Sequence, residues 1–443
     1  MKQKNQSDLP QRTEWVEKER QSMDDQTAQL HLFDAYGIEL EYMIVDRETL
    51  NVKPIADELI MQAAGELSSD FDDGTICWSN ELALHVIELK TNGPVGSLVG
   101  FAKEFRRSLN RLNQIAEQFN SRLMPTAMHP WMDPIDDLKL WPHDNNPIYE
   151  AYNRIFDCRG HGWANLQSMH INLPFSGDDE FGRLHAAIRL VLPILPAIAA
   201  SSPFADGRET GFLDYRMEVY RNNSAKIPSI TGLVVPEPVF TQADYEREIF
   251  DVTYRNIAPY DPDGFLQHPF LNSRGAIARF DRGAIEIRVI DVQECPEVDC
   301  AIAETVTKLV QLLVSESVSS FSQQKAMATI PLANIFFDVV CNAEKSIIRD
   351  HRYLDLIGVS SSHATAKEVW AELISRLIQH PIREPLSAKT VSVMQTITKD
   401  GPLARRITEA VCHNVDRLPA VYGKLCDCLQ QGKMFLAENE TSL

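Results

Sequence analysis

The chain has 443 residues, of which 44% are hydrophobic and 24% are charged, and its formal net charge at pH 7 is −19. This composition is typical of a globular protein with a large core, and the length predicts one large domain or two to three ordinary ones. The negative charge disfavours attraction to nucleic acid or anionic lipid, because both present phosphates. We therefore expect small-molecule substrates, with any anion held by metal ions or by locally placed arginines.

The N-terminal residues 1–30 are polar and highly charged and lack the apolar segment of a secretory signal, so we expect a tail outside the core. The eight cysteines show no CxxC pair and are too sparse for a disulfide scaffold, which favours a reducing, cytoplasmic setting. The most apolar stretch, residues 186–200, contains Arg189 and two prolines. It is too short to span a bilayer and predicts a buried, kinked helix rather than a membrane segment.

The next elements follow from hydrophobic periodicity. FDAYGIELEYMIVD (33–46) and SMHINLPF (168–175) alternate as strands, and apolar residues over 101–119 recur at helical spacing. GAIARFDRGAIEIRVID (275–291) predicts a hairpin with Gly283 at the position that needs a positive φ. Helical periodicity dominates from residue 300 to about 435.

Strands that fall mostly between residues 35 and 300, followed by a helix-rich region, predict an α+β protein. We expect a mainly antiparallel sheet with helices packed on one of its faces. The sequence contains no repeat and no low-complexity linker, so residues 31–443 are expected to form a single domain.

The segment GIELEY places Glu39 and Glu41 on the same face of a strand, with Ile38 and Leu40 on the other. Like charges side by side repel each other unless the face meets water or a cation lies between them. A solvated strand face is the simpler interpretation of this segment alone.

Other predicted strands repeat this arrangement, with one apolar face and one face of groups that bind metal or phosphate. Mg²⁺ and Mn²⁺ prefer carboxylate oxygens and accept a lone imidazole among them, whereas zinc motifs such as HExxH are absent from the sequence. The candidate ligands are Glu39, Glu41, Glu81, Glu88, His170 and Glu286, with Arg279 and Arg288 beside them.

Each candidate also has a plain structural interpretation. His170 could be an ordinary hydrogen-bonded histidine, and Glu286 and Arg288 could form a surface ion pair of little energetic consequence. Glu81 and Glu88 are seven residues apart, so in a regular strand they would face opposite sides. Both can reach one site only through a bulge, a bend or a turn of helix.

Neither a GxxxxGK[ST] loop nor a GxGxxG loop is present, so ATP would have to be held by metal-bridged phosphates and arginines. GRETGFLDYRMEVYRN (207–222) contains a local basic cluster that includes Arg216 and Arg221. This cluster is either a solvated surface or an anion clamp.

Together these motifs resemble the carboxylate-amine ligase family, also called type-2 glutamate-cysteine ligases, from about residue 35 to about residue 300. GIELEYMIVD is similar to the Gly-x-Glu-x-Glu strand of that family, and ELALHVIELKTN to the following Glu-containing segment. MHP, at 128–130, is similar to a His-Pro of the family. SSPFADGRETGFLDYR (201–216) is the most specific match, and ARFDRGAIEIRVIDVQECP resembles the late strand with its Glu-x-Arg and nearby Asp.

The resemblance implies the glutamine synthetase catalytic fold, a curved antiparallel sheet with helices on its convex face and Mg²⁺ and ATP on its concave face. It implies an ATP-dependent ligase that phosphorylates a carboxylate, commonly that of glutamate, and then forms an amide with an amine, with cysteine as the default. It also implies a homodimer. Residue by residue, it gives metal roles to the six candidate ligands and a catalytic, phosphate-facing role to Arg288, with Arg279 beside it. Arg216 and Arg221 would assist in binding ATP.

Two departures qualify the resemblance, and one is that the C-terminal third of the chain resembles the family only loosely. The family often has His-x-His where this chain has His170-Ile171-Asn172, which puts the amine substrate in question more than the ATP half-reaction.

Loops at 206–230 and 257–275 are candidate lids over an acyl phosphate. The alternatives to a ligase are a phosphotransferase on the same sheet and a regulatory protein that binds a nucleotide or an amino acid.

Overall fold

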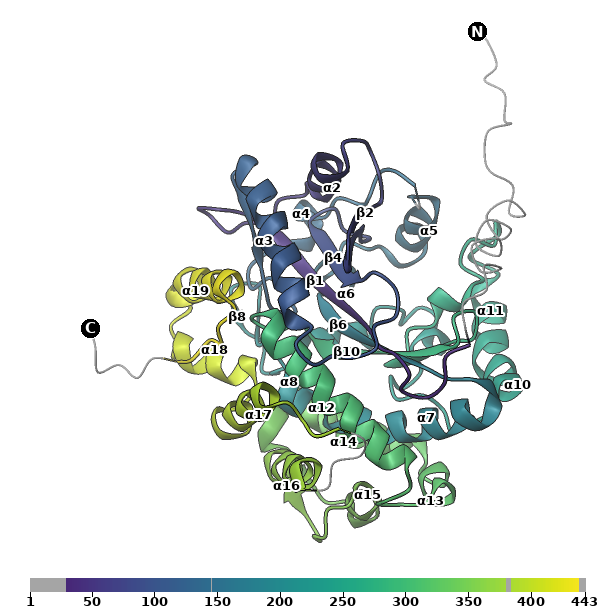
Figure 1. The fold of residues 1–443 in the computed structure, drawn as a ribbon. Coiled ribbons are helices and arrows are strands. Elements are labelled where there is room, and N and C mark those ends of the chain that lie inside the picture. The colour runs from purple at the N-terminus through teal and green to yellow at the C-terminus, as the bar shows by residue number, and fades with distance from the viewer. Residues whose placement is uncertain (1–28, 145, 380–383, 438–443) are drawn as a thin grey trace.

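An eight-stranded sheet lies at the centre of the protein, in a computed structural model that describes residues 29–144, 146–379 and 384–437 (Figure 1). The predicted tail over 1–30 falls outside these residues except for its last two positions. The strand order is β2-β3-β4-β1-β6-β10-β9, with β5 paired to β1, and every pairing is antiparallel. The strands are β1 (Gly37–Asp46), β2 (Asp70–Asp73), β3 (Ile76–Asn80), β4 (Val86–Thr91), β5 (Ser121–Met124), β6 (Ser168–Pro174), β9 (Ala276–Arg279) and β10 (Ala284–Asp291).

Helices surround this sheet, and two small hairpins are formed by β7 (Phe204–Ala205) with β8 (Arg208–Glu209) and by β11 (Ile347–Ile348) with β12 (Ala364–Thr365). The helices before β9 are α2 (Ala56–Ala64), α3 (Ala102–Gln118), α4 (Pro134–Asp137), α5 (Asn146–Phe156), α6 (His161–Ala164), α7 (Gly177–Val191), α8 (Pro196–Ala199), α9 (Tyr215–Tyr220), α10 (Gln242–Tyr245) and α11 (Asp251–Ile257). The later helices are α12 (Pro296–Val314), α13 (Phe321–Lys325), α14 (Thr329–Asn342), α15 (His351–Ile357), α16 (Ala366–Gln379), α17 (Ala388–Asp400), α18 (Leu403–Val411) and α19 (Leu418–Gln431). The short helical turns are η1 (Leu192–Ile194), η2 (Pro228–Ile230), η3 (Glu246–Phe250), η4 (Pro269–Leu271), η5 (Ala343–Lys345) and η6 (Val415–Arg417). The predicted α+β class with a mainly antiparallel sheet is therefore confirmed.

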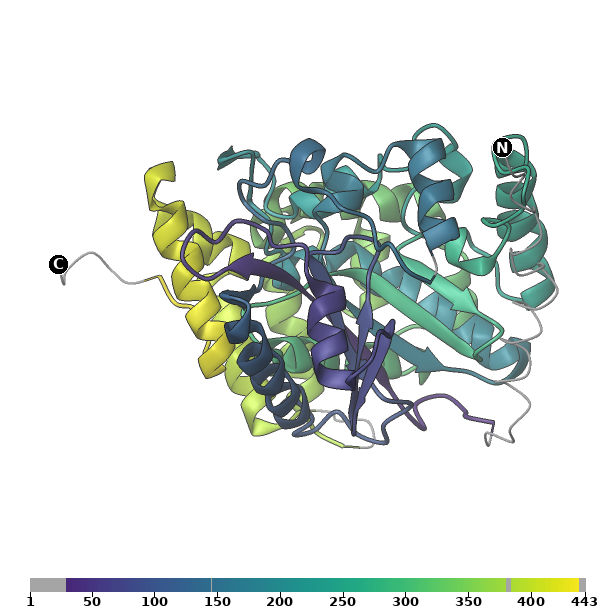
Figure 2. The same cartoon turned by 90° about the horizontal axis from the view of Figure 1, so that it is seen from above.

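Helices cover one face of the sheet (Figure 2), and the side chains on that face are apolar. Ile38, Leu40 and Tyr42 of β1 are fully buried on this face. Helix α3 contacts β3 and β4, α7 and α8 contact β10, and α12 packs against both α3 and α7. The burial of large side chains against these helices is the main contribution to stability, and it leaves the other face of the sheet free to carry polar groups.

Several local predictions are confirmed. The helical pattern over 101–119 forms α3. The apolar stretch 186–200 is helical but interrupted, since η1 separates α7 from α8 where the two prolines occur. The hairpin joins β9 to β10, and Gly283 adopts a φ of 58° in the turn.

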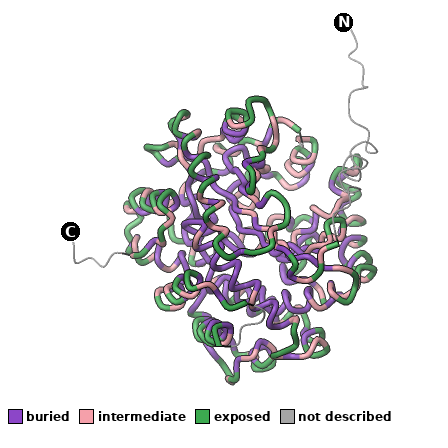
Figure 3. Tube along the Cα trace, viewed as in Figure 1, coloured by how far each residue is buried: buried purple, intermediate pink, exposed green. Residues whose placement is uncertain are grey.

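A large cluster of buried apolar residues runs from Phe33, next to β1, to Leu429 in α19, and Figure 3 shows where buried residues lie along the trace. It includes residues of the sheet and of the C-terminal helices, so the helix-rich region shares a core with the strands. A second cluster packs Met43 and Val45 of β1 against Ile407 of α18 and Leu425 of α19. Among the described residues, no helix has the length and apolarity needed to cross a membrane.

Candidate active site

The polar face of the sheet is built by strand register. Glu41 of β1 lies directly opposite Glu88 of β4, and Glu39 lies opposite His170 of β6. On the far side of β6, Asn172 is opposite Glu286 of β10. Residues directly opposite each other in neighbouring strands share a face. Four strands therefore bring these groups together, although they are far apart in the sequence.

Two groups of side chains on this face have the geometry of a metal site. Glu39, His170 and Glu286 each offer one ligand atom, and these three atoms lie within 4.8 Å of one another. Glu41, Glu88 and His170 form a second group with the same spacing. All of these residues are buried or part-buried. We call the five residues together the carboxylate cluster.

His170 lies at the centre of this cluster. Its Nδ1 is 2.8 Å from Glu39 Oε2 and 3.7 Å from Glu286 Oε1, and its Nε2 is 2.9 Å from Ser168 Oγ. Burial alone would lower the pKa of His170, but Glu39, Glu286 and Glu41 outweigh burial and raise the pKa to about 9. The imidazole lies close to three carboxylates, and their negative charges would also attract a cation to this place.

Strand β10 contains a bulge at Arg288, the residue that we expect to face the phosphates of ATP. Ile287 pairs with Ile171 and Ile290 pairs with Met169, so Arg288 and Val289 together oppose only His170. Gly275 permits this shape, because its carbonyl accepts a hydrogen bond from Arg288 N, and a Cβ there would lie 2.4 Å from Val289 Cγ1. The Arg288 guanidinium turns back to Glu286, with Nε 2.9 Å from Oε1.

Glu81 and Glu88 are an odd number of residues apart, yet they can reach the same region, because only Glu88 belongs to a strand. Strand β3 ends at Asn80 and β4 begins at Val86, so Glu81 lies in the connection and strand alternation does not apply to it. Burial raises the pKa of Glu81, and the charges of Glu41 and Glu88 raise it further. Electrostatically, Glu81 thus belongs with the second group.

The predicted arginines occupy different places. Arg279 forms two hydrogen bonds to Asp281, at 3.1 and 2.8 Å, and lies near enough to Glu286 for that charge to act on it. Arg221 pairs with Glu218 at 2.8 Å and lies over the ring of Phe337.

Arg216 is buried beneath the site. Its Nε donates to Asp291, and its two terminal nitrogens lie 3.3 and 3.4 Å from the carbonyl oxygen of Arg288. The structure thus joins Arg216 to the β10 bulge from below, and its role in binding ATP remains a prediction.

Sequence reasoning missed three side chains of the site. Lys90 Nζ contacts Glu88 Oε2 at 2.6 Å, and Ser168 donates to Glu41 from both its backbone N, at 2.6 Å, and its Oγ, at 3.0 Å. Alternation could have found Lys90 and Ser168, because each is two residues from a predicted ligand on the same strand. Tyr149 of α5 accepts a hydrogen bond from Asn80 at 3.1 Å, and no strand pattern identifies it.

The donor set of the carboxylate cluster fits a hard divalent cation. It consists of carboxylate oxygens and one imidazole, without any thiolate, which is the combination that Mg²⁺ and Mn²⁺ accept. The fit is also electrostatic, because a cation would offset the repulsion between carboxylates that face each other across strands.

Solved structures share this fold. Glutamate-cysteine ligase from Francisella tularensis, solved in complex with AMP, superimposes with a TM-score of 0.56 at 12% identity, over 91% of this chain and 90% of that one. A bifunctional glutathione synthetase from Pasteurella multocida gives a TM-score of 0.52 at 13% identity, over 90% of this chain and 52% of that one. The architecture is therefore an α+β fold of the glutamate-cysteine ligase kind.

Sequence comparison defines the family. Residues 35–336 match the model of glutamate-cysteine ligase family 2, and the chain belongs to that family. An uncharacterised protein from Archaeoglobus fulgidus is 34% identical over 280 residues, which are 63% of this chain and 75% of that protein. A protein from Bradyrhizobium sp. (strain ORS 278), provisionally named glutamate-cysteine ligase 2, is 28% identical over 61% of this chain and 59% of its own length. The predicted resemblance is confirmed.

Proposed function

We propose that the protein is an ATP-dependent carboxylate-amine ligase that forms an amide through an acyl phosphate. One observation carries this proposal, namely the two groups of ligand atoms, each within 4.8 Å, that four strands assemble on one face of the sheet. Membership of glutamate-cysteine ligase family 2 supports the reaction class. Glutamate is the default carboxylate and cysteine the default amine.

In this proposal Glu39, Glu286 and the neutral form of His170 would hold one divalent cation, and Glu41 and Glu88, with Glu81 nearby, would hold a second. When bound, such ions neutralise the charge of the ATP phosphates and help to align them for transfer. Mg²⁺ is the expected ion and Mn²⁺ the expected substitute. The sheet would then correspond to the curved, ligand-binding sheet of the glutamine synthetase type.

The chain's own residues position the reactants. Arg288 offers a planar, two-pronged donor to the transferring phosphoryl group, and it must exchange Glu286 for phosphate oxygens to do so. The bulge in β10 aims Arg288, and Arg216 fixes the carbonyl of the bulge from below. The loops at 206–230 and 257–275 are proposed to close over the acyl phosphate and exclude water.

The overall reaction balances as carboxylate plus ATP plus alkylammonium giving amide, ADP, inorganic phosphate and one proton. Phosphoryl transfer breaks the bond between the γ-phosphorus and the bridging oxygen of ATP and forms a carboxyl-phosphate bond. The amine then forms the carbon-nitrogen bond, the carbon-oxygen bond to phosphate breaks, and the electron pair leaves with phosphate. The protons lost by nitrogen pass to phosphate and solvent.

The test is incubation with ATP, Mg²⁺ and a panel of amino acids, with phosphate release measured together with mass detection of any new amide. A ligase releases phosphate in proportion to amide. Phosphoryl transfer that continues without any amine-dependent product would identify a phosphotransferase instead. A homodimer is expected and is tested separately by light scattering.

A further inference from the structure

Lys90 is a cation placed directly beside the carboxylate cluster. It lies on β4, two residues from Glu88 on the same face of the strand, and directly opposite Glu39 of β1. Glu39 belongs to one of the two groups of candidate metal ligands and Glu88 to the other. Lys90 is therefore next to both groups, and the proposed function assigns no role to it.

A triangle of hydrogen bonds joins Lys90 to the cluster. Lys90 Nζ donates to Glu88 Oε2 at 2.6 Å and to Ser79 Oγ at 2.7 Å. Ser79 Oγ donates in turn to the same carboxylate oxygen, at 2.5 Å. Two donors thus share Oε2 of Glu88, so a metal ion at Glu88 must either bind the other oxygen or displace the ammonium group.

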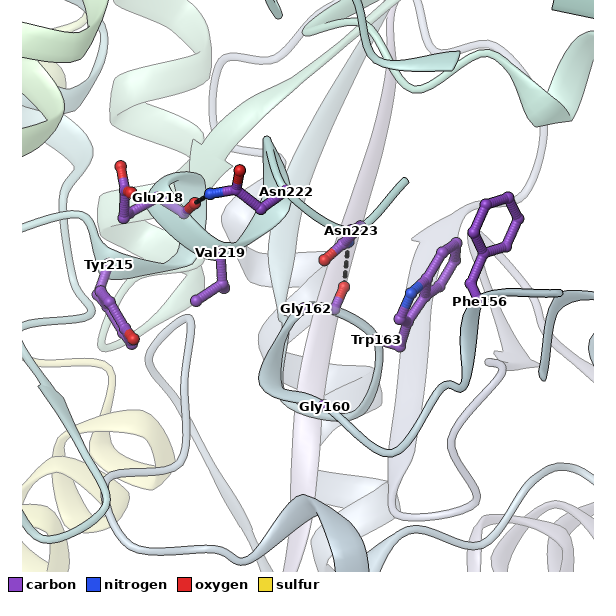
Figure 4. Close-up of a pocket in the computed structure, with 9 residues that line it drawn as sticks. All are labelled: Phe156, Gly160, Gly162, Trp163, Tyr215, Glu218, Val219, Asn222 and Asn223. Atoms are coloured by element: carbon purple, nitrogen blue, oxygen red, sulfur yellow. Dashed lines mark hydrogen bonds between the residues drawn. The ribbon is translucent and has the colours of Figure 1, made fainter. Parts of the chain in front are cut away.

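An ordinary ion pair elsewhere in the protein shows what is unusual about Lys90. Glu218 pairs with Arg221 at 2.8 Å, beside a hollow of about 320 Å³ between α6 and α9 (Figure 4). Among the described residues that line this hollow, the only carboxylate is Glu218, so the pair leaves no negative charge of the lining without a partner. Lys90, by contrast, neighbours both Glu88 and Glu39, and one ammonium group cannot neutralise two carboxylates.

The two groups of ligands are unequal, because they share His170. The Nδ1 of His170 is 2.8 Å from Glu39, whereas its Nε2 is 3.9 Å from Glu41. With His170 in the first group, Glu41 and Glu88 remain for a second ion, with Glu81 nearby. One oxygen of Glu88 already accepts two hydrogen bonds. The second position therefore offers fewer free ligand atoms, and it has a positive charge beside it.

The ammonium group of Lys90 is able to leave Glu88 without disturbing the core. The side chain of Lys90 is 36% exposed, whereas that of Glu88 is 7% exposed. A lysine side chain is a compact charge on a flexible stem, so at this exposure it can turn from Glu88 toward an anion above the sheet. The phosphates of ATP are such anions, and they would also supply oxygen ligands to a metal ion.

We propose that Lys90 makes the second cation site depend on the nucleotide. Without ATP, the ammonium group repels a divalent ion next to Glu88 and occupies an oxygen that this ion would use. With ATP bound, the phosphates offset the charge of Lys90, and the second ion is retained. This inference rests on the proposed function and adds to it the order of binding, in which the second ion enters together with the nucleotide.

Equilibrium dialysis against Mn²⁺ at neutral pH tests this inference without following any reaction, because it counts the metal and the nucleotide bound per chain. The wild type is expected to bind one Mn²⁺ tightly when Mn²⁺ is the only ligand, and two together with a saturating non-hydrolysable ATP analogue. Lys90→Met removes the charge and keeps the length of the side chain. Without nucleotide, this variant should bind a second Mn²⁺ about tenfold more tightly than the wild type, or better.

Further variants separate the charge of Lys90 from its packing. Lys90→Gln is neutral but still carries a donor for Glu88, and it is expected to gain the second ion as Lys90→Met does. Lys90→Arg keeps the charge and is expected to bind Mn²⁺ like the wild type. Lys103→Met is the matched control, because Lys103 is exposed on α3, which packs against β4 from the apolar face of the sheet. It should leave Mn²⁺ binding unchanged, and circular dichroism checks the fold of every variant.

The outcomes separate this inference from the proposed function. The role of Lys90 is wrong if the wild type binds two Mn²⁺ equally tightly without nucleotide, if the neutral variants gain nothing, or if Lys103→Met gains as much as Lys90→Met. If the wild type binds no Mn²⁺ even with the analogue, the metal sites of the proposed function are wrong and this inference is lost with them. If Mn²⁺ binds as expected but no amide forms in the ligation assay, the ligase reaction is wrong and the role of Lys90 remains.

Discussion

Neutralising one carboxylate of the candidate site should stabilise the metal-free protein and should reduce the further stabilisation that Mg²⁺ gives. Glu81→Gln is the most suitable change, because burial and the charges of Glu41 and Glu88 raise the pKa of Glu81. The ionised form of this side chain is therefore unfavourable in the folded protein. Glutamine keeps the shape and removes the charge.

The magnitude follows from the spacing of the cluster. The charges of Glu41 and Glu88 act on Glu81, and two unit charges about 5 Å apart repel each other by about 3.3 kcal/mol at an effective dielectric constant of about 20. Lys90 and His170 offset part of this repulsion, so we expect Glu81→Gln to raise the free energy of unfolding by about 1 to 3 kcal/mol without metal. A ligand at a hundred times its Kd stabilises a protein by about 2.7 kcal/mol, and the variant should lose much of that gain.

The assay is urea unfolding followed by tryptophan fluorescence, with EDTA and then with saturating Mg²⁺. Glu66→Gln, at an exposed position, is the control and should change neither measurement appreciably. The reasoning would be refuted if Glu81→Gln destabilised the EDTA-treated protein, or if Mg²⁺ stabilised the variant and the wild type equally.

Three further changes test other parts of the account. Glu39→Gln and Glu286→Gln should each abolish ATP turnover with the circular dichroism spectrum unchanged, and near-normal turnover in either would remove that residue from the site. Arg288→Lys should lose most activity, because a point charge cannot replace a two-pronged donor; wild-type rates would exclude the phosphate role. Burial alone would raise the pKa of Asp73, but a serine hydroxyl and two half-exposed arginines lower it overall. Its stabilising effect is thus present above about pH 4 and is lost as pH falls through its lowered pKa. Asp73→Asn should therefore cost about 1 kcal/mol at pH 7 and progressively less as the pH falls below about 4, and a cost that does not change with pH would contradict this assignment.

Strand alternation was sufficient to predict most of the polar face. Glu39 and Glu41 on β1, and His170 on β6, follow directly from the period of two, since a strand fixes which side chains share a face. Alternation also identifies the apolar face of the sheet. The helices that cover this face are predicted from a different pattern, the helical spacing of apolar residues.

Alternation failed where the backbone departs from a regular strand. In a regular β10, Asp291 would face away from Arg288, but the bulge shifts the alternation by one residue and brings Asp291 opposite Ser168 on the polar side. The bulge depends on Gly275, which immediately precedes β9 and is distant in sequence from Arg288, so the local pattern around Arg288 does not reveal it. Arg216 is similar, because its buried partner is 75 residues away in the sequence.

The central claim is that carboxylates from separate strands hold divalent ions that bind ATP. Anomalous diffraction from crystals grown with Mn²⁺ and a non-hydrolysable ATP analogue tests it most directly. The account predicts one peak in contact with Glu39 and Glu286 and a second in contact with Glu41 and Glu88, both touching the phosphates. Well-ordered analogue with no anomalous peak at these four carboxylates would contradict it.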